Sequence, residues 1–269
     1  EVLPGKEPGW GVTAGDTVFT IWREFNRAGT GDRVAMPPGR LYILDPPLFT
    51  TFTAGSYLTS AYPEDKVFID GRLEVHSTAH YERYVRMLQG GPAWQQADAQ
   101  FRFNAAIVQY MEAMDLTLER LRDPGWVPVF LDDNAIVFLR RNEANQQIIE
   151  RDGITDQKLT ERFPLLDAAG AEAVPLPPVP SWTARHLGVI RFPWSEMNLG
   201  QFFLAVGRDR FAAAQFAAGV AAAPALAAPR VMLASALSRL GKPAAALPAI
   251  ESARRLGGGR SARARTEIV

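Results

Sequence analysis

Three charged residues that could carry chemistry, Asp70, Arg72 and Glu74, alternate around Gly71 directly after the apolar run 67–69. Alternate residues of an extended chain point to the same face, so we expect the three side chains to lie together. The planar fork of an arginine suits a polar ligand such as a sugar or a phosphate, and two nearby carboxylates suit acid–base catalysis. The remaining interpretation is an ion-paired turn that locks a strand to the next helix. We favour this turn over ligand binding, and ligand binding over catalysis.

Metal binding is the second kind of chemistry that the spacing of residues suggests. His76 and His80 are four residues apart, a spacing that could place two ligands on one helix face. Ser77 is a helix-capping residue, however, which places His76 before the helix and favours an ordinary surface helix start. The acidic segment 132–134 resembles half a calcium loop but lacks the glycine and the distal glutamate, so it predicts a turn. We therefore expect no metal and no cofactor.

The composition excludes several classes of function. Basic and acidic residues balance at 29 each, so the chain lacks the positive field that nucleic-acid binding needs. The absence of cysteine excludes disulfides, zinc–thiolate sites and thiol catalysis. No apolar run approaches the roughly 20 residues that span a bilayer, and no signal peptide is visible. Because the chain begins on Glu1 rather than methionine, we expect a fragment of a longer protein.

The hydrophobic pattern predicts an α/β domain. An amphipathic helix is expected at 17–27, before this domain. The order that follows, β-α-β-α-β-α-β-β, predicts a small, mostly parallel sheet with an antiparallel edge hairpin. The expected strands are 41–44, 67–69, 105–110, 126–131 and 135–139, and the expected helices are 54–62, 77–89, 93–99, 116–121, 143–151 and 156–163.

Composition also suggests domain boundaries, because a run of prolines separates the α/β pattern from alanine-rich helices. Such a run forms a stiff, extended linker. The predicted organisation is a lead-in with a short helix at 1–38, the α/β domain at 39–172, a Pro-rich linker at 173–182, helical repeats at 183–259 and a basic tail at 260–269.

The helical part has an internal period. Gly200, Phe203, Gly207, Ala212, Phe216 and Pro224 are followed 34 residues later by Ala234, Leu237, Gly241, Ala246, Ile250 and Gly258. This pattern resembles the tetratricopeptide repeat, in which small residues let paired helices approach closely. Two repeats are fewer than the roughly three needed for independent stability, so we expect them to pack on the α/β domain or to continue in a longer array.

Several blocks of residues between 39 and 141 resemble a known family. They are Gly55-Ser56-Tyr57-Leu58, then Val67-Phe68-Ile69-Asp70-Gly71-Arg72 with Glu74, then Pro124-Gly125-Trp126-Val127-Pro128-Val129-Phe130 with Asp132, and Ile136-Val137-Phe138-Leu139. The pattern is similar to the soluble C-terminal domain of bacterial multi-pass membrane glycosyltransferase-like proteins, which resemble protein mannosyltransferases. Ser56 replaces a usual glycine, and Thr50 stands where asparagine is common.

The resemblance implies that the chain is the extracytoplasmic, periplasmic end of a longer membrane-embedded protein, with a glycosyltransferase as the parent. In such proteins sugar transfer is expected from acidic residues in membrane-proximal loops, which this chain lacks. The resemblance therefore implies a non-catalytic accessory domain that binds a partner protein through its helical repeats. It also implies that a glycan or lipid-linked sugar binds in a crevice at residues 70–74. Asp70, Arg72, Glu74 and Tyr57 are the candidate ligand-binding residues.

A second hypothesis is an α/β enzyme that acts on a sugar or a nucleotide at the carboxyl ends of its strands. The surroundings of Asp70 and Arg72 separate the two hypotheses. Burial of both residues, with contacts only to each other or to backbone, would exclude the enzyme. Exposure of both in a deep pocket with a third polar group would favour it.

Overall fold

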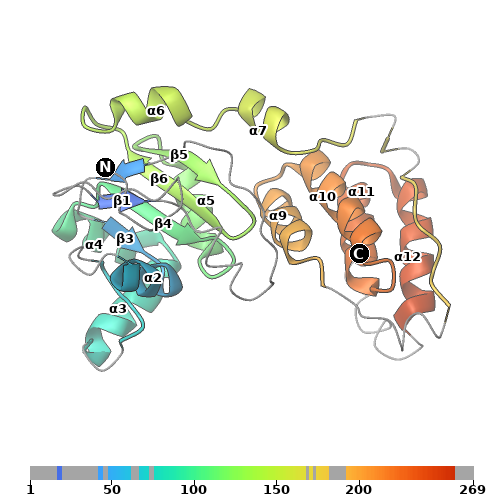
Figure 1. Ribbon diagram of the computed structural model, residues 1–269, viewed down its shortest axis with the longest axis horizontal. Helices are drawn as coiled ribbons and strands as arrows, with labels where there is room; N and C mark the ends of the chain where they lie inside the picture. Colours follow the sequence, from blue (N-terminus) through green and yellow to red (C-terminus); the bar gives the residue numbers. More distant parts are fainter. Residues whose placement is uncertain are drawn as a thin grey trace, which may run out of the picture. The chain divides into compact units, whose positions relative to one another are not determined.

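The computed structural model describes residues 17–19, 42–44, 48–61, 67–72, 76–167, 170–171, 174–181 and 192–257 (Figure 1). The chain divides into two compact units, Glu1–Ile154 and Thr155–Val269. The division lies N-terminal to the proline-rich segment that the sequence predicted as a linker. Among the helices that the structure describes, none has the length and apolar character needed to cross a membrane.

The first unit is built on a four-stranded sheet of order β3-β4-β6-β5. β3 (Leu48–Thr50) runs parallel to β4 (Ala105–Gln109), whereas β6 (Ala135–Arg140) runs antiparallel to both β4 and β5 (Trp126–Leu131). The predicted α/β class and the edge hairpin are confirmed. The prediction of a mostly parallel sheet is wrong, because the hairpin inserts β6 between β4 and β5 and so makes the sheet mixed.

Two short segments differ from the prediction at the β3 edge of the sheet, which lies opposite the β5 edge. The strand predicted at 67–69 is reduced to one parallel bridge, between Val67 and Leu48. The partner strand β3 begins directly after Pro46-Pro47 and was not predicted, since three residues carry too little periodicity to identify. The segment 67–72 nevertheless runs beside β3 in the parallel sense, so its carboxyl end lies at the same edge as the ends of β3 and β4.

A second, two-stranded sheet precedes this one in the sequence. β1 (Thr17–Phe19) pairs antiparallel with β2 (Tyr42–Leu44). The helix predicted at 17–27 is therefore wrong over the first three residues, where pairing with β2 overrides the helical spacing; residues 20–27 lie outside the described chain. The strand predicted at 41–44 is confirmed, although it belongs to this smaller sheet.

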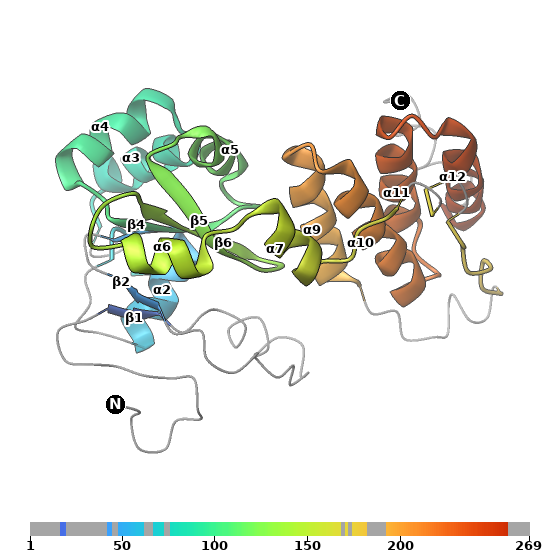
Figure 2. The same ribbon diagram turned by 90° about the horizontal axis from the view of Figure 1, so that it is seen from above.

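Helices cover both faces of the four-stranded sheet. Figure 2 shows α3, α4 and α5 on one side and α2 and α6 on the other. All of these helices overlap helices predicted from the sequence. Their bounds are α2 Phe52–Ala61, α3 Thr78–Leu88, α4 Gly91–Phe101, α5 Met114–Arg122 and α6 Gln146–Asp152.

The start of α3 was predicted correctly, and its buried face only in part. Ser77 caps the helix, since its Oγ accepts a hydrogen bond of 3.2 Å from the backbone N of His80. The helical spacing of the sequence places Tyr81, Tyr84, Val85 and Leu88 on one face. Of these, Tyr84 is buried, whereas Tyr81 and Val85 are 42% and 39% exposed. Met87 is the other buried residue of the helix.

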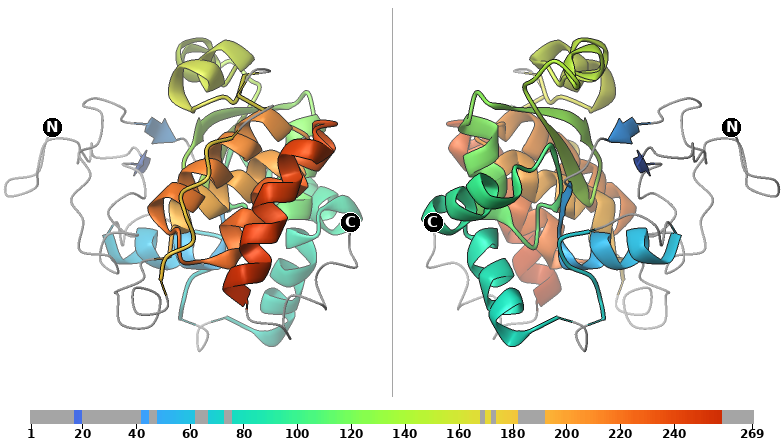
Figure 3. Two further views of the ribbon diagram at one scale, coloured as in Figure 1. Left: turned by 90° about the vertical axis from the view of Figure 1, so that its right-hand side faces the viewer. Right: turned by 90° about the vertical axis from the view of Figure 1, so that its left-hand side faces the viewer.

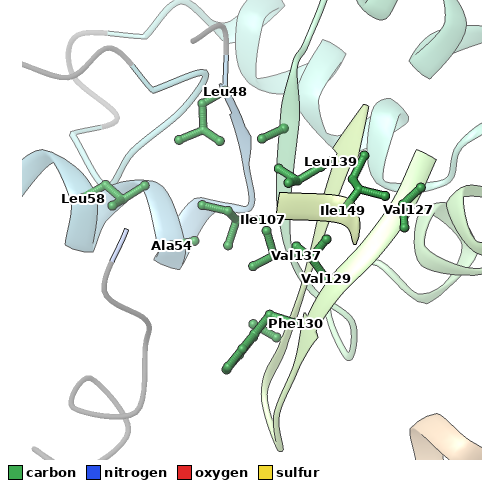
Figure 4. Close-up of a cluster of buried hydrophobic side chains, with 12 residues drawn as sticks. Leu48, Ala54, Leu58, Ile107, Val127, Val129, Phe130, Val137, Leu139 and Ile149 are labelled. Carbon is green, nitrogen blue, oxygen red and sulfur yellow. The ribbon is translucent and has the colours of Figure 1, made fainter. Parts of the chain in front are cut away.

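The core of the first unit has two parts, one on each face of the sheet. A cluster of buried side chains, aliphatic except for Phe130, lies under α2 and α6 and is drawn in Figure 4. On the opposite face Phe49 meets the rings of Trp94 at 4.9 Å and Phe103 at 5.5 Å between centroids. β4 is buried on both faces, which explains its continuous apolar run without alternation. The labelled side chains of the cluster in Figure 4 are Leu48, Ala54, Leu58, Ile107, Val127, Val129, Phe130, Val137, Leu139 and Ile149.

The second unit is helical over most of its described residues. The last four described helices pack in three successive pairs, α9 with α10, α10 with α11 and α11 with α12, as the orange-to-red ribbons of Figures 1 and 3 show. The helices of this unit are α7 Asp156–Arg162, α9 Trp194–Ala205, α10 Asp209–Ala222, α11 Ala227–Arg239 and α12 Pro243–Gly257.

The turns between these helices repeat at the spacing seen in the sequence. Gly207 and Gly241 both have positive φ, 75° and 73°. Arg208 N donates to Phe203 O at 2.8 Å, and 34 residues later Lys242 N donates to Leu237 O at 2.9 Å. Both turns therefore close the preceding helix with the same left-handed glycine cap.

The close helix approach predicted at the small residues is present in the first helix pair. A Cβ on Gly200 would lie 2.4 Å from Cε1 of Phe216, so the ring of α10 rests on the backbone of α9. Ala234, Leu237 and Ala246 of the second pair are buried. Gly258 and the predicted basic tail 260–269 lie outside the described residues.

Candidate functional site

The segment that carries Asp70 is held by a backbone contact with α2. A Cβ on Gly55 would lie 1.8 Å from the carbonyl oxygen of Ile69 and 2.9 Å from Oγ1 of Thr50. Only a glycine at position 55 lets the helix lie against this segment. The two sequence blocks around Gly55 and Asp70 are therefore neighbours in space, although the sequence between them forms most of a helix and a connection.

The Asp70 carboxylate is surrounded by donors of its own chain, and its side chain is only 2% exposed. Oδ1 accepts from the backbone N of Arg72 at 2.9 Å and lies 3.3 Å from Nε2 of His76. Oδ2 accepts from Nη2 of Arg72 at 2.5 Å and from Oγ1 of Thr59 at 3.1 Å, while Nε of Arg72 reaches both oxygens. A carboxylate offers about four acceptor positions, so these partners fill it. We call Thr59, Asp70, Arg72 and His76 the Asp70 cluster.

The hydrogen bonds fix the charge of this carboxylate. Donation from the Arg72 side chain is the main reason that the pKa of Asp70 lies well below its usual range. The Arg72 backbone N–H, Thr59 and His76 lower the pKa further, and burial opposes them. Asp70 therefore stays ionised at neutral pH, which makes it unsuited to donate a proton as a general acid.

The two central residues of the predicted site are not exposed together. The side chain of Asp70 is buried, whereas that of Arg72 is 59% exposed. The partners of Asp70 also include Thr59 and His76, so neither condition set for or against the enzyme hypothesis is met in full. Glu74 lies outside the described residues, as does the side chain of Tyr57 in α2. The structure thus brings together Asp70 and Arg72 from the predicted set.

Sequence reasoning missed Thr59 and His76 as parts of this cluster. Thr59 lies on α2 and His76 just before α3, so the cluster connects two helices to the segment 67–72. Nothing in the sequence around Thr59 signals this contact. His76 stands out in the sequence for its spacing to His80, and that spacing does not indicate a contact with Asp70.

The two histidines also contact the segment 67–72. Nε2 of His80 lies 2.7 Å from the carbonyl oxygen of Phe68, and the rings of His76 and His80 stack at 5.2 Å. Within the described ranges, no three His, Asp or Glu side chains come together as metal ligands. The histidines therefore pack the start of α3 against the segment that ends in Asp70.

The predicted turn at 132–134 is confirmed. Oδ1 of Asp132 accepts from the backbone N of Asn134 at 2.9 Å and of Ala135 at 2.8 Å. These side-chain-to-backbone hydrogen bonds shape the connection of the β5–β6 hairpin. Tyr110 donates its OH to the Asp132 carbonyl at 3.1 Å, which ties the end of β4 to the same turn.

A second buried charge of this unit also has a structural role. Arg120 of α5 is 4% exposed and pairs with Glu119 at 2.5 Å and Asp123 at 2.7 Å. Its guanidinium lies 5.1 Å from the ring centroid of Trp94 in α4. The stacking on Trp94 holds α5 against α4, and the ion pairs within α5 and its C-cap fix the position of the guanidinium.

Comparisons with protein-family models, curated proteins and solved structures return no match to this chain. The function of the chain is therefore inferred from the geometry of its residues. That geometry makes the Asp70 cluster a connection between α2, the segment 67–72 and the start of α3. Its exposed part is the arginine side chain.

Proposed function

We propose that the chain is a non-catalytic accessory domain that binds a partner protein through the helices of its second unit. In this proposal the chain lies on the extracytoplasmic, periplasmic side of a bacterial membrane as part of a longer membrane glycosyltransferase-like protein. The helices α9 to α12 would be repeats of the tetratricopeptide type.

One observation carries the proposal: the second unit repeats its helix–turn–helix with equivalent caps at Gly207 and Gly241. Stacked helix pairs of this kind form extended surfaces that bind other chains. The first unit supports a non-catalytic role, because the Asp70 carboxylate is filled by donors of the protein itself. An ionised, shielded carboxylate has no free position for a substrate proton.

Site-specific photocrosslinking in the source cells tests the proposal. A photoreactive amino acid at Val231 or Leu247, which are 40% and 58% exposed on α11 and α12, should crosslink to one and the same partner. Glu82 on α3, whose side chain is 60% exposed, is the matched position in the first unit and should not yield that product. Identical products from all three positions, or none from α11 and α12, would contradict partner binding by the helices.

A glycan or lipid-linked sugar at Arg72 is a second candidate, supported by the 59% exposure of that side chain. A thermal-shift screen against activated sugars and polyprenyl-phosphate head-group analogues tests it. A ligand that stabilises the parent chain and not Arg72→Ala would support the site. A silent screen, in which Arg72→Ala only lowers the melting temperature, would leave the Asp70 cluster as a structural connection.

A further inference from the structure

The proline-rich segment of the second unit has an unusually restricted backbone. Each of the seven residues 174–180 either is a proline or directly precedes one. Proline fixes φ near about −65°, and a residue before proline is held in extended conformations. Together these restrictions select the polyproline II helix, which has about three residues per turn and no internal hydrogen bonds.

The exposure of this segment follows the same period of three. Pro175, Pro178 and Ser181 are exposed, and every described residue between them is half-buried. One edge of the segment therefore faces solvent while its other two edges rest on the protein. In Figures 1 and 3 the yellow trace runs along the helices of the second unit.

A buried arginine holds the centre of the segment. Arg230 of α11 is 0% exposed, and its Nη2 donates to the carbonyl oxygens of Pro177 at 2.9 Å and Pro224 at 3.1 Å. Its Nη1 donates to Oγ of Ser252 in α12 at 3.1 Å. Among the described residues no carboxylate pairs with Arg230. Burial and the nearby charge of Arg255 lower the pKa of its guanidinium.

A buried guanidinium without a carboxylate is costly unless other acceptors satisfy it. Carbonyl groups of a polyproline II segment are suited to this task, because they make no hydrogen bonds within their own helix. The segment is also stiff, so little conformational entropy is lost when it binds. The chemistry of Arg230 therefore matches an extended, proline-containing chain rather than an acidic one.

We propose that the surface around Arg230 on α11 and α12 recognises a proline-rich segment in the polyproline II conformation. Residues 174–181 occupy this surface within the chain, and a proline-rich segment of the partner protein takes their place. This inference rests on the proposed function, since it names the chemistry of the partner. The chain's own segment acts as a competitor at an effective concentration on the order of millimolar.

Single-cysteine labelling in the full chain tests the exchange, because the natural sequence contains no cysteine. Val179→Cys reports a half-buried position of the segment, and Ser181→Cys is the matched exposed position. A synthetic peptide with the sequence of residues 174–181, at concentrations above about 1 mM, should raise the labelling rate of Val179→Cys about threefold or more. The rate of Ser181→Cys should stay unchanged, and a peptide with glycine in place of each proline should have no effect. Unchanged labelling of Val179→Cys at the solubility limit of the peptide would overturn the proposal.

A loosened variant with Pro175, Pro177, Pro178 and Pro180 changed to glycine gives the second measurement. In this variant the chain's own segment competes less for the surface around Arg230. The variant should therefore bind a fluorescently labelled peptide with the sequence of residues 174–181 at least about tenfold more tightly than the parent chain does. Adding Arg230→Met should abolish this binding, and Ser252→Ala, a milder change at the same place, should weaken it. If the loosened variant folds but does not bind the peptide, the proposal is overturned. If the variant does not fold, the cysteine-labelling experiment decides between the outcomes.

The two proposals fail in different ways. A partner that crosslinks to α11 and α12 but is not displaced by the proline-rich peptide would overturn only the chemistry assigned to Arg230. Peptide binding without any crosslinked partner would instead overturn the proposed function and leave the recognition site in place.

Discussion

Gly55 and Ile69 touch backbone to backbone: a methyl group on Gly55 would lie 1.8 Å from the Ile69 carbonyl oxygen. This contact sets how closely α2 lies against the segment that ends in Asp70. The hydrogen bond from Thr59, one turn further along α2, reaches Oδ2 of Asp70 because of that approach. The glycine in the first sequence block and the aspartate in the second are thus parts of one packing arrangement.

Gly55→Ala should destabilise the first unit by about 3 kcal/mol or more, because the new methyl group meets backbone atoms that cannot turn away. Urea unfolding followed by tryptophan fluorescence measures the change. Ser56→Ala, on the same helix and half-buried, is the control and should change stability by less than about 1 kcal/mol. Equal effects of the two substitutions would show that the approach of α2 is not constrained at Gly55.

Asp70→Asn should cost about 2–3 kcal/mol near neutral pH, since the amide cannot accept from all the donors of the Asp70 cluster. The folded-state pKa of Asp70 is depressed, so its contribution is present above the unfolded pKa of about 3.9 and is lost as the pH falls toward the folded value. The stability difference between parent and variant should therefore shrink below about pH 4. Urea titrations at several pH values check this, and a difference that does not depend on pH would contradict it.

Gly200→Ala should destabilise the second unit by about 1–3 kcal/mol, because the methyl group meets the ring of Phe216. Gly219→Ala in α10 is the matched control: the nearest neighbouring atom would lie 3.4 Å away, and alanine favours the helix by about 0.5–1 kcal/mol. Phe216→Leu should reduce the cost of Gly200→Ala when the two are combined. Far-UV circular dichroism during urea unfolding measures the stability of the parent chain and of each variant. Additive effects of Gly200→Ala and Phe216→Leu in the double variant would refute the contact between the two residues.

Gly207→Ala and Gly241→Ala should each cost about 1 kcal/mol, and the two costs should be alike. Both positions have positive φ, and no atom lies within 4 Å of the added methyl group, so only backbone strain contributes. Thermal unfolding of the two variants measures the costs. Asparagine, which tolerates this conformation better, should restore part of the loss at both positions, and rescue at one position alone would argue against equivalent turns.

The long, periodic elements were predictable from the sequence, and the short strands were not. The β5–β6 hairpin has two six-residue strands around a polar turn, so its pattern is strong. β3 has three residues, and Val67 forms a single bridge, so their structure depends on partners that are distant in the sequence. For β1 the sequence predicted a helix where the structure has a strand, because its residues fit a helical spacing but pair with β2.

The candidate site was predictable only where its residues are close in the sequence. Asp70 and Arg72 pair across one glycine, and their contact follows from local geometry. Thr59 reaches the same carboxylate from another helix, and the sequence holds no pattern for such a contact. The buried face of α3 was predicted for Tyr84 and not for Met87, since the elements packed against α3 decide whether Tyr81 or Met87 is covered.

The position of β6 in the sheet also has a consequence for synthesis of the protein on the ribosome. β6 is the last of the described strands along the chain, yet it pairs with β4 on one side and β5 on the other. A nascent chain that has emerged only as far as β4 carries an apolar strand with an unpaired edge, which is open to association with other chains. At about 5–20 residues per second this interval lasts for a few seconds, until Arg140 has emerged as well. The nascent protein is therefore most in need of a chaperone between the emergence of Gln109 and that of Arg140.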